Sequence, residues 1–352
     1  MIKPIFHYCV MTSNRGDKAI RAAVAREIHK YCSIPIAYFN VKFEEITEQR
    51  IEQINNEASL LLIGGSGLYT NYKLSSGWYF PCKTELFNKI KVPIVLIGIG
   101  CNNNLADDLY GGISEQARAS IKLINEQAVL SSVRDKRTYD MLAGLGITKH
   151  ELMPDPALFL DVPKVKKEKR VAINISQHIP LLGRYDGRQD IRAKNIECFS
   201  HIINYLTGFG YTVVFIAHDV LEQSIIEDLK KRTYALEYIN TDVIDDMLRE
   251  YARCEFSIGV RMHSNILSLA AGTPFIAVAY DQKSIEFCKL MGLLPLPLNI
   301  LDYTYEDLLE RCKAQIYDYN VSQATKLTKD WYSEVYGKFI QRIVSYANGD
   351  KS

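Results

Sequence analysis

Short, continuous runs of apolar residues alternate along this chain with segments in which apolar residues recur every three or four positions. A continuous apolar run is typical of a parallel strand covered on both faces, and the longer repeat is typical of an amphipathic helix. The alternation of the two patterns predicts an α/β fold. The apolar runs occupy residues 2–10, 59–63, 92–97, 130–133, 171–175, 212–217, 256–260 and 275–279, and a long final helix is expected over 324–347.

One stretch of the chain carries a complete strand, helix and second strand. The run 256–260 ends at a glycine, and a helical repeat follows that stops at a Gly-Thr-Pro sequence before the run 275–279. Two strands joined by a helical crossover are parallel. Arg261 and His263 are therefore predicted at the carboxyl end of one strand and Lys283 at the end of the next, where open α/β sheets bind ligands.

Arg261, His263 and Lys283 form a predicted cluster of cationic donors beside a helix N-terminus. That end of a helix presents unpaired N–H groups and the positive end of the helix dipole, so it favours an anion. The alternative is that Arg261 makes an ordinary surface ion pair and His263 caps a turn. The three residues together favour an anion site.

Two further side chains follow predicted strands. Arg134 comes after the run 130–133 and either joins an anion site, where Asp135 is expected to orient its side chain, or makes only a local ion pair with Asp135. His218 comes after the run 212–217 and is interpreted as a general base, as a contact to an acceptor sugar, or as the cap of the following helix.

Glycines mark three predicted turns. Residues 14–17 read Asn-Arg-Gly-Asp and are expected to enter a helix, with Asp17 as its cap and Gly16 either approaching a ligand closely or forming only a tight turn. The glycine-rich segments 64–68 and 98–103 are predicted to be flexible, amide-rich loops at one sheet edge. The first lacks the Gly-Lys-Ser/Thr of a P-loop, and the second lacks the third glycine of a dinucleotide fingerprint.

The overall charge adds no preference for a charged partner. The 42 Lys and Arg balance 41 Asp and Glu, which argues against nucleic acid or an acidic membrane surface as a partner of the whole surface. The eight cysteines have no zinc-ligand spacing, so we expect reduced core residues and no metal site. No leader pattern is visible and no apolar run approaches the roughly 20 residues of a membrane span, so we expect a cytoplasmic protein.

A cationic run at residues 162–170 predicts the boundary between two domains. The chain of 352 residues is long enough for two domains with separate cores. We expect an N-terminal Rossmann-like domain over residues 1–161 and a C-terminal one over 171–322 that carries the anion site. The helix within 323–352 is expected to pack back on the N-terminal domain.

Several separated motifs occur in order along the chain. They are Asn14-Arg-Gly-Asp17, Ile63-Gly-Gly-Ser-Gly-Leu68, Gly98-Ile-Gly100, Ser132-Val-Arg-Asp135, Asp155-Pro-Ala-Leu158, Gly259-Val-Arg-Met-His263, Ala271-Gly-Thr-Pro274 and Tyr280-x-x-Lys283. In order and spacing, this set resembles the polysaccharide pyruvyl transferase family over residues 11–287. Ser66 stands where the family often has another glycine.

The resemblance implies a fold like that of the GT-B glycosyltransferases, with two Rossmann-like domains facing each other across a cleft. It also implies a reaction in which pyruvate from phosphoenolpyruvate forms a ketal on two hydroxyls of a sugar in a cell-surface polysaccharide or its precursor, releasing phosphate. Phosphoenolpyruvate is then a co-substrate, and no cofactor is expected. The saccharide acceptor would be nucleotide- or lipid-linked, and a lipid-linked acceptor would bring the protein to the inner face of the cell membrane.

The resemblance implies that Arg261 and His263 bind the donor, with Arg134 on the opposite side of the cleft. Arginines bind carboxylate and phosphate oxygens through paired donors. On chemical grounds, His263 is the predicted acid that protonates the donor's methylene carbon, Lys283 offsets charge on the leaving phosphate, and Asp17 is the candidate base. Further predicted substrate contacts are Asn14, Gly65, Ser66 and His218.

Two other functions fit the same residues. A GT-B glycosyltransferase would use a basic strand-end cluster for the diphosphate of a nucleotide sugar, but the chain lacks an evident acidic pattern late in the second domain that would grip a ribose. A non-catalytic carbohydrate- or phosphate-binding protein would keep the fold without the chemistry, and the intact cationic cluster argues against it. No residue pattern specifies the acceptor sugar or the oligomeric state.

Overall fold

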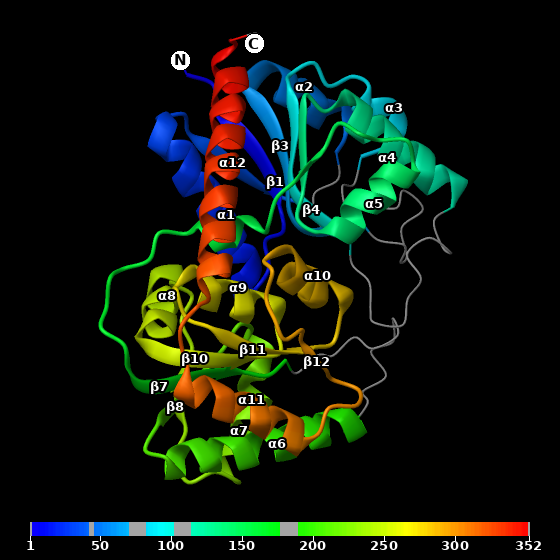
Figure 1. The fold of residues 1–352 in the computed structure, drawn as a ribbon. Coiled ribbons are helices and arrows are strands. Elements are labelled where there is room, and N and C mark those ends of the chain that lie inside the picture. The colour runs from blue at the N-terminus through cyan, green and yellow to red at the C-terminus, as the bar shows by residue number, and fades with distance from the viewer. Residues whose placement is uncertain (1, 42–45, 70–81, 102–113, 177–188, 351–352) are drawn as a thin grey trace.

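The chain folds into two six-stranded parallel β-sheets with helices packed on both faces of each (Figure 1). The structure, a computed structural model, describes residues 2–41, 46–69, 82–101, 114–176 and 189–350. Parallel strands joined by helical crossovers form a Rossmann-like layer in each half of the chain, so the predicted α/β class is confirmed. The division of the chain into domains at residues 161 and 171 stays a prediction.

The first sheet, which we call the N-terminal half together with its helices, has the strand order β2-β1-β3-β4-β5-β6. Its strands are β1 (Ile5–Cys9), β2 (Ile36–Asn40), β3 (Leu60–Tyr69), β4 (Ile94–Cys101), β5 (Leu130–Val133) and β6 (Glu151–Leu152). Its helices are α1 (Arg15–Tyr31), α2 (Glu48–Glu57), α3 (Thr84–Phe87), α4 (Glu115–Gln127) and α5 (Lys136–Gly144), followed by the 3₁₀ turn η1 (Pro156–Phe159).

The second sheet and its helices form the C-terminal half, with the strand order β12-β11-β10-β7-β8-β9. Its strands are β7 (Glu168–Asn174), β8 (Thr212–Ile216), β9 (Glu237–Ile239), β10 (Cys254–Gly259), β11 (Phe275–Ala279) and β12 (Leu298–Asn299). Its helices are α6 (Gln189–Gly208), α7 (Gln223–Lys230) after the 3₁₀ turn η3 (Val220–Glu222), α8 (Ile244–Arg253), α9 (Met262–Ala270), α10 (Gln282–Leu290) and α11 (Tyr305–Tyr317). The long α12 (Gln323–Asn348) follows. In the described ranges, no helix combines the length and the apolar composition that crossing a bilayer requires.

The predicted strands agree best with the observed ones inside the sheets. β5 and β11 have the bounds that their apolar runs predict, and β10 pairs with β11 in parallel as expected. The apolar pattern missed β2, β6, β9 and β12, which are the four edge strands of the two sheets. An edge strand is less covered, so its sequence does not need a continuous apolar run. β2 is only partly buried, and β6 and β12 have two residues each.

The glycine-rich segments at 64–68 and 98–103 were expected to be loops, and this expectation is wrong for the described part of both. β3 continues to Tyr69 and β4 to Cys101. A Cβ atom at Gly64, whose φ is +142°, would lie 2.1 Å from the carbonyl oxygen of Ile97 on β4. Glycine is therefore needed for the two strands to approach each other, which explains why these residues stay within the sheet.

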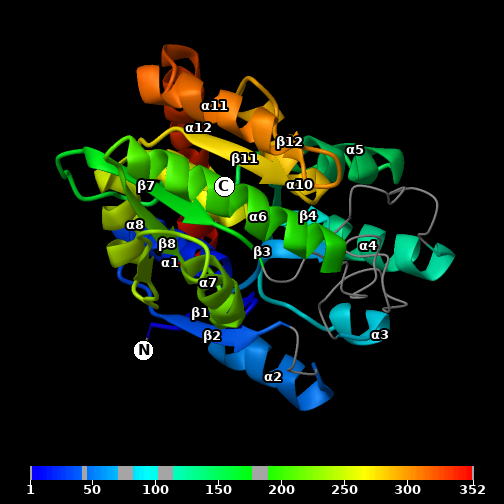
Figure 2. The ribbon, with the colours of Figure 1, turned by 90° about the horizontal axis from the view of Figure 1, so that it is seen from below.

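The two sheets separate three apolar cores among the described residues. In Figures 1 and 2, α6 and α11 cover the face of the second sheet that points away from the N-terminal half, and α8, α9 and α10 cover the other face. The largest apolar cluster joins α1 and η1 of the N-terminal half to α8, α9 and α12. The two sheets thus meet through a continuous core of helices.

The final helix α12 contacts both halves. It runs beside α1 in Figure 1, and its Tyr336 ring stacks on Phe159 of η1 with the ring centroids 4.6 Å apart. At its other end, the Nζ atom of Lys329 donates to the carbonyl oxygens of Ala270 at 2.9 Å and Leu269 at 3.4 Å, at the end of α9. A cation at these carbonyls complements the negative end of the α9 dipole.

The start of α1 is fixed directly to the C-terminal half. The backbone N–H of Arg15 donates to the carbonyl oxygen of His218 at 2.9 Å. The buried guanidinium of Arg15 donates to the side chain of Asn240 at 2.6 Å and to the carbonyl oxygen of Thr241 at 3.2 Å. These bonds hold the N-terminus of α1 against the segments that follow β8 and β9.

We predict that His7 makes folding sensitive to acid. The side chain is fully buried in β1, and this burial lowers its pKa from 6.5 to about 4. Below about pH 6.5, His7 binds a proton in the unfolded chain but stays neutral in the folded protein. The free energy of unfolding is therefore unaffected by His7 above that pH and falls as the pH drops toward 4.

The free energy of unfolding, measured with urea between pH 7 and pH 4.5, should lose up to about 1.4 kcal/mol per pH unit from this one group. His7→Gln keeps a side-chain donor near the carbonyl oxygen of Gly64, the present partner at 3.3 Å, but does not titrate. The variant should show a correspondingly shallower pH dependence. Equal slopes in both proteins would contradict the buried, neutral state of His7.

Candidate functional site

Three cationic side chains predicted from the sequence stand where strands end and helices begin. Arg134 lies between β5 and α5, Arg261 is the N-cap residue of α9, and Lys283 lies in the first turn of α10. The charge of Arg134 acts on Lys283, and the charges of Lys283 and Arg261 both act on the buried Tyr280. The three residues therefore share one electrostatic environment although they come from both halves of the chain.

Asp155 connects the two halves of this environment. Its Oδ2 atom accepts from Nη1 of Arg134 at 2.8 Å and lies 3.4 Å from Nε2 of His263. Its Oδ1 atom accepts from the backbone N–H of Ala157, which fixes the carboxylate at the start of η1. Arg134 and Asp155 belong to the N-terminal half and His263 to α9 of the C-terminal half. One carboxylate oxygen therefore brings the predicted donor-binding arginine and the predicted acid together.

The environment of Asp155 keeps it ionised. The residue is 1% exposed, and burial alone would raise its pKa. His263 and Arg134 outweigh this effect and lower the pKa to about 2. A buried carboxylate is stable in this form only while its partners remain in place.

The expectation that Asp135 orients Arg134 is wrong. Asp135 is the N-cap residue of α5, and its Oδ1 atom accepts from both the backbone N–H and the hydroxyl of Thr138 at 2.7 Å. An aspartate that directly precedes a helix is a preferred N-cap, because its carboxylate satisfies free N–H groups of the first turn. The carboxylate that pairs with Arg134 is instead Asp155.

Two glycines leave space for site side chains. A Cβ atom at Gly16 would lie 2.2 Å from Nδ1 of His263, and one at Gly100 would lie 2.5 Å from Nε of Arg134. Any larger residue would collide with these groups. The close approach to a ligand expected at Gly16 stays a prediction, and the group that lies against Gly16 in the structure is the imidazole of His263.

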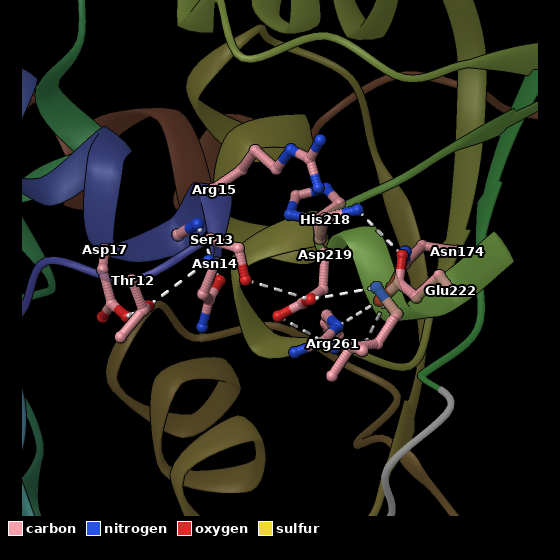
Figure 3. A network of polar contacts seen from close by, with 12 residues as sticks. Thr12, Ser13, Asn14, Arg15, Asp17, Asn174, His218, Asp219, Glu222 and Arg261 are labelled. Carbon is pink, nitrogen blue, oxygen red and sulfur yellow. Dashed lines mark hydrogen bonds and ion pairs between the residues drawn. The ribbon is translucent and has the colours of Figure 1, made fainter.

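Arg261 has carboxylate partners in the C-terminal half. Its Nε atom donates to Glu222, which is fully buried, and its Nη2 atom lies 3.9 Å from Asp219 (Figure 3). Glu222 also accepts from the backbone N–H of His218 at 2.8 Å and from the side chain of Asn174 at 3.1 Å. The cluster is therefore less positive than the sequence alone indicates, because carboxylates neutralise its cations.

His218 is completely buried, with its Nε2 atom 2.8 Å from the hydroxyl of Tyr251. Burial, followed by the charges of Arg261, His263 and Arg15, places its pKa well below the ordinary value. The cap of the following turn is not His218, as one interpretation held, but Asp219. The geometry gives the predicted substrate contact of His218 no support, and it makes the residue a neutral part of the junction between the halves.

Lys283 keeps a contact with solvent. Its side chain is 24% exposed, and its Nζ atom lies 3.0 Å from Oδ2 of Asp281. Burial lowers its pKa, but the attraction of Asp281 is strong enough to give a net rise. Asp281 also caps α10 through the backbone N–H of Ser284, so the partner of Lys283 is held in place.

The segment before α1 joins the same network, as Figure 3 shows. Asn14, and not Asp17 as expected, is the N-cap residue, because its side chain accepts from the N–H of Gly16 at 2.9 Å. Asp17 lies in the first turn and accepts from the hydroxyl of Thr12 at 3.0 Å. The hydroxyl of Ser13 donates to Asp219 at 3.3 Å, which links this segment to the carboxylates around Arg261.

Gly65 and Ser66 both lie within β3, in the left-handed backbone region, with φ values of +75° and +85°. A Cβ atom at Gly65 would lie 2.4 Å from Cγ2 of Ile20. Gly65 therefore packs against α1, and its predicted contact with substrate gains no support from this packing. Ser66 is half-buried, and its role stays a prediction.

The site holds polar atoms that are buried without a hydrogen-bond partner among the described residues. They include Nε of Arg134 and Nδ1 of His218. A buried donor left unpaired costs about 1–3 kcal/mol, so the free Nε atom of Arg134 favours a polar ligand beside it. Across the described ranges, no three His, Cys, Asp or Glu side chains are gathered in a way that would hold a metal ion.

Sequence reasoning missed the two buried carboxylates that organise the site. Asp155 belongs to one of the ordered motifs, which was a usable signal, but no role was assigned to it. Glu222 lies in η3 among ordinary helical residues and has no distinguishing sequence context. Both carboxylates become recognisable only when their partners from distant segments are seen.

Comparison with solved structures shows the fold. Staphylococcus aureus MnaA, in a co-structure with UDP, superposes with a TM-score of 0.59 at 14% identity, covering 99% of this chain and 98% of that one. A putative UDP-N-acetylglucosamine 2-epimerase from Listeria monocytogenes gives 0.59 at 11% identity with the same coverage. The UDP-GlcNAc 2-epimerase from Methanocaldococcus jannaschii gives 0.57 at 10%, covering 97% and 99%. The predicted GT-B-like arrangement of two Rossmann-like units is confirmed.

Sequence comparison gives the family. The amylovoran biosynthesis protein AmsJ of Erwinia amylovora is 26% identical over 189 residues, and the match spans 46% of this chain and 45% of that protein. The family model described as polysaccharide pyruvyl transferase matches residues 14–282, which include all the site residues named above except Thr12, Ser13, Lys283 and Ser284. This chain belongs to the polysaccharide pyruvyl transferase family.

Proposed function

We propose that this protein transfers pyruvate from phosphoenolpyruvate to two hydroxyls of a sugar, forming a ketal and releasing phosphate. Membership of the family and the relative in amylovoran biosynthesis support a role as a transferase in polysaccharide biosynthesis. The observation that carries the finer proposal is the meeting of Arg134 and His263 at one oxygen of Asp155. An arginine that binds an oxyanion and an imidazole that transfers a proton are the groups that this reaction needs.

Donor binding is assigned to the cationic cluster. Phosphoenolpyruvate carries a carboxylate and a phosphate on adjacent atoms, and guanidinium groups bind such oxyanions through paired N–H donors. Arg134 has a free Nε donor, Lys283 reaches solvent, and Arg261 stands at the N-terminus of α9. Because carboxylates already neutralise part of this charge, the site favours a small anion that fits these donors closely over polyanions in general.

The reaction starts with a proton passed from His263 to the methylene carbon of the donor. The neighbouring carbon then gains positive character, and one sugar hydroxyl adds to it while its proton passes to a base, for which Asp17 is the candidate. A second hydroxyl attacks the same carbon, the bond from that carbon to the phosphate oxygen breaks, and phosphate leaves with the proton of this hydroxyl. Lys283 offsets the charge of the departing phosphate.

The acceptor enters beside the segment before α1 in this proposal, where Asn14 and Asp17 lie. The proposed acceptor is a nucleotide- or lipid-linked saccharide. The nucleotide in the co-structure of S. aureus MnaA makes a nucleotide-linked acceptor reasonable for this fold. A lipid-linked acceptor would place the protein at the inner face of the cell membrane.

The direct test mixes the purified protein with phosphoenolpyruvate and a panel of nucleotide- and lipid-linked sugars. We expect phosphate release that depends on the acceptor, together with a product whose mass has increased by one pyruvyl ketal. Phosphate assays and mass spectrometry report the two sides of the same reaction. Consumption of a nucleotide sugar as donor, without use of phosphoenolpyruvate, would instead identify a glycosyltransferase.

Arg134→Lys should weaken phosphoenolpyruvate binding about tenfold or more, because lysine keeps the charge beside Asp155 but loses the paired donors of a guanidinium. Keeping the charge matters, since a neutral residue would leave a buried carboxylate unpaired. Lys136→Ala is the matched control, because it removes an exposed cation two residues away. Calorimetric titration with phosphoenolpyruvate should show a lower affinity for Arg134→Lys than for Lys136→Ala. Equal affinities of the two variants would show that Arg134 does not bind the donor.

His263→Asn should lower kcat about 10²- to 10⁴-fold while the dissociation constant for phosphoenolpyruvate changes less than about threefold. Asparagine keeps a polar side chain beside Asp155 but cannot deliver a proton to carbon. Steady-state kinetics and a separate binding titration measure the two quantities. A variant with wild-type kcat would show that another group supplies the proton.

Gly16→Ala should reduce turnover although alanine adds only one methyl group. Its Cβ atom would lie 2.2 Å from Nδ1 of His263, so the imidazole must move. We expect kcat to fall at least about tenfold, since small misplacements of a reacting group are costly. Gly146→Ala is a control for changing a glycine, because no atom lies within 4 Å of the added methyl group, although its φ of +77° adds local strain. Full activity of Gly16→Ala would contradict the placement of His263.

A further inference from the structure

Asp155 has a position that the proposed chemistry does not require. Neither donor binding nor proton transfer, as described above, uses a carboxylate between Arg134 and His263. A bare carboxylate there opposes binding of an anionic donor, because it competes for the same guanidinium. Its side chain is nevertheless only 2% exposed and touches both groups.

We propose that Asp155 is a positioning residue, which holds the imidazole of His263 toward the donor bound by Arg134. The proposal rests on the proposed function, since it assigns His263 the role of acid. Asp155 does not touch the donor in this arrangement. It acts through the two side chains that do.

The imidazole is held from two sides. The Nε2 atom of His263 lies 3.4 Å from Asp155, and the ring edge with Nδ1 lies against Gly16, where even a methyl group would collide. These two neighbours restrict rotation of the ring about its side-chain bonds, and Nε2, which has no hydrogen-bond partner among the described residues, is the nitrogen that can carry the proton to the donor. An aspartate that orients a catalytic imidazole is a recurrent device in enzymes.

The carboxylate is itself mounted rigidly. Its Oδ1 atom accepts from the N–H of Ala157, and the ring of the following Pro156 fills the space where a side chain at Gly98 would lie. Phe159, at the end of the same turn, stacks on Tyr336 of α12. The η1 turn also packs against both α1 and α9. Asp155 therefore has a fixed place relative to both halves of the site.

These contacts predict opposite effects on binding and on turnover. Removing the charge of Asp155 frees the guanidinium of Arg134 for the donor, so donor affinity should stay the same or increase. Removing it also releases the imidazole, so proton transfer should slow. A carboxylate that only stabilised the fold would not separate these two quantities in this direction.

The test compares wild type, Asp155→Asn and Asp155→Glu. For Asp155→Asn we expect a dissociation constant for phosphoenolpyruvate that is unchanged or several-fold lower, with kcat reduced about 10- to 100-fold, as for other residues that orient a reacting group. Asp155→Glu keeps the charge and guards against loss of folding, and its longer side chain should reduce kcat without strengthening donor binding. Asp161→Asn, on an exposed carboxylate in the same connection, is the matched control and should behave as wild type.

A second measurement does not depend on activity. Diethyl pyrocarbonate acylates accessible imidazole nitrogens, and peptide mass spectrometry gives the rate for His263 alone. In wild type the ring is 11% exposed and held, so modification should be slow. We expect Asp155→Asn to accelerate it several-fold and Asp161→Asn to leave it unchanged.

The two proposals fail in different ways. If wild type neither binds nor consumes phosphoenolpyruvate, the proposed function is wrong, and the modification rate of His263 still decides whether Asp155 holds the ring. If wild type is active, Asp155 is not a positioning residue when Asp155→Asn or Asp155→Glu retains full kcat. The same conclusion follows if Asp155→Asn loses affinity and turnover together, or if its His263 is modified at the wild-type rate.

Discussion

The contact of one buried carboxylate, Asp155, with Arg134 and His263 is the interaction on which the arrangement of the site depends. A charge removed from water is tolerated only when partners compensate it, and here the partners come from different halves of the chain. Arg134 and Asp155 pair within the N-terminal half, and His263 adds the contact from the C-terminal half. The need to compensate this buried charge therefore determines which side chains meet at the site.

The inner strands of the two sheets could be predicted from the sequence because one constraint determines their composition. Strands buried on both faces need continuous apolar runs, and β5 and β11 follow the pattern to the residue. The four edge strands lack this constraint, so no continuous apolar run predicted them. The final helix was predicted within one residue at each end, because 26 residues of helical repeat leave little ambiguity.

The positions of the site residues were also predictable, whereas their partners were not. Arg134 and Arg261 stand at strand ends because local order along the chain places them there. Their pairing with Asp155 and Glu222 depends on how distant segments pack, and a single sequence contains no record of that packing. Glycine was ambiguous for a related reason. Its small size suits a phosphate, a neighbouring strand or an imidazole equally well, and Gly16 proved to accommodate the imidazole.

The course of α12 has a consequence for synthesis on the ribosome. This helix covers α1, yet more than 290 residues separate the end of one from the start of the other. During translation, the part of α1 that α12 covers therefore stays uncovered until nearly all the rest of the protein has been made. A nascent chain with its first sheet complete would still expose this apolar surface of α1, and a chaperone is expected to bind there.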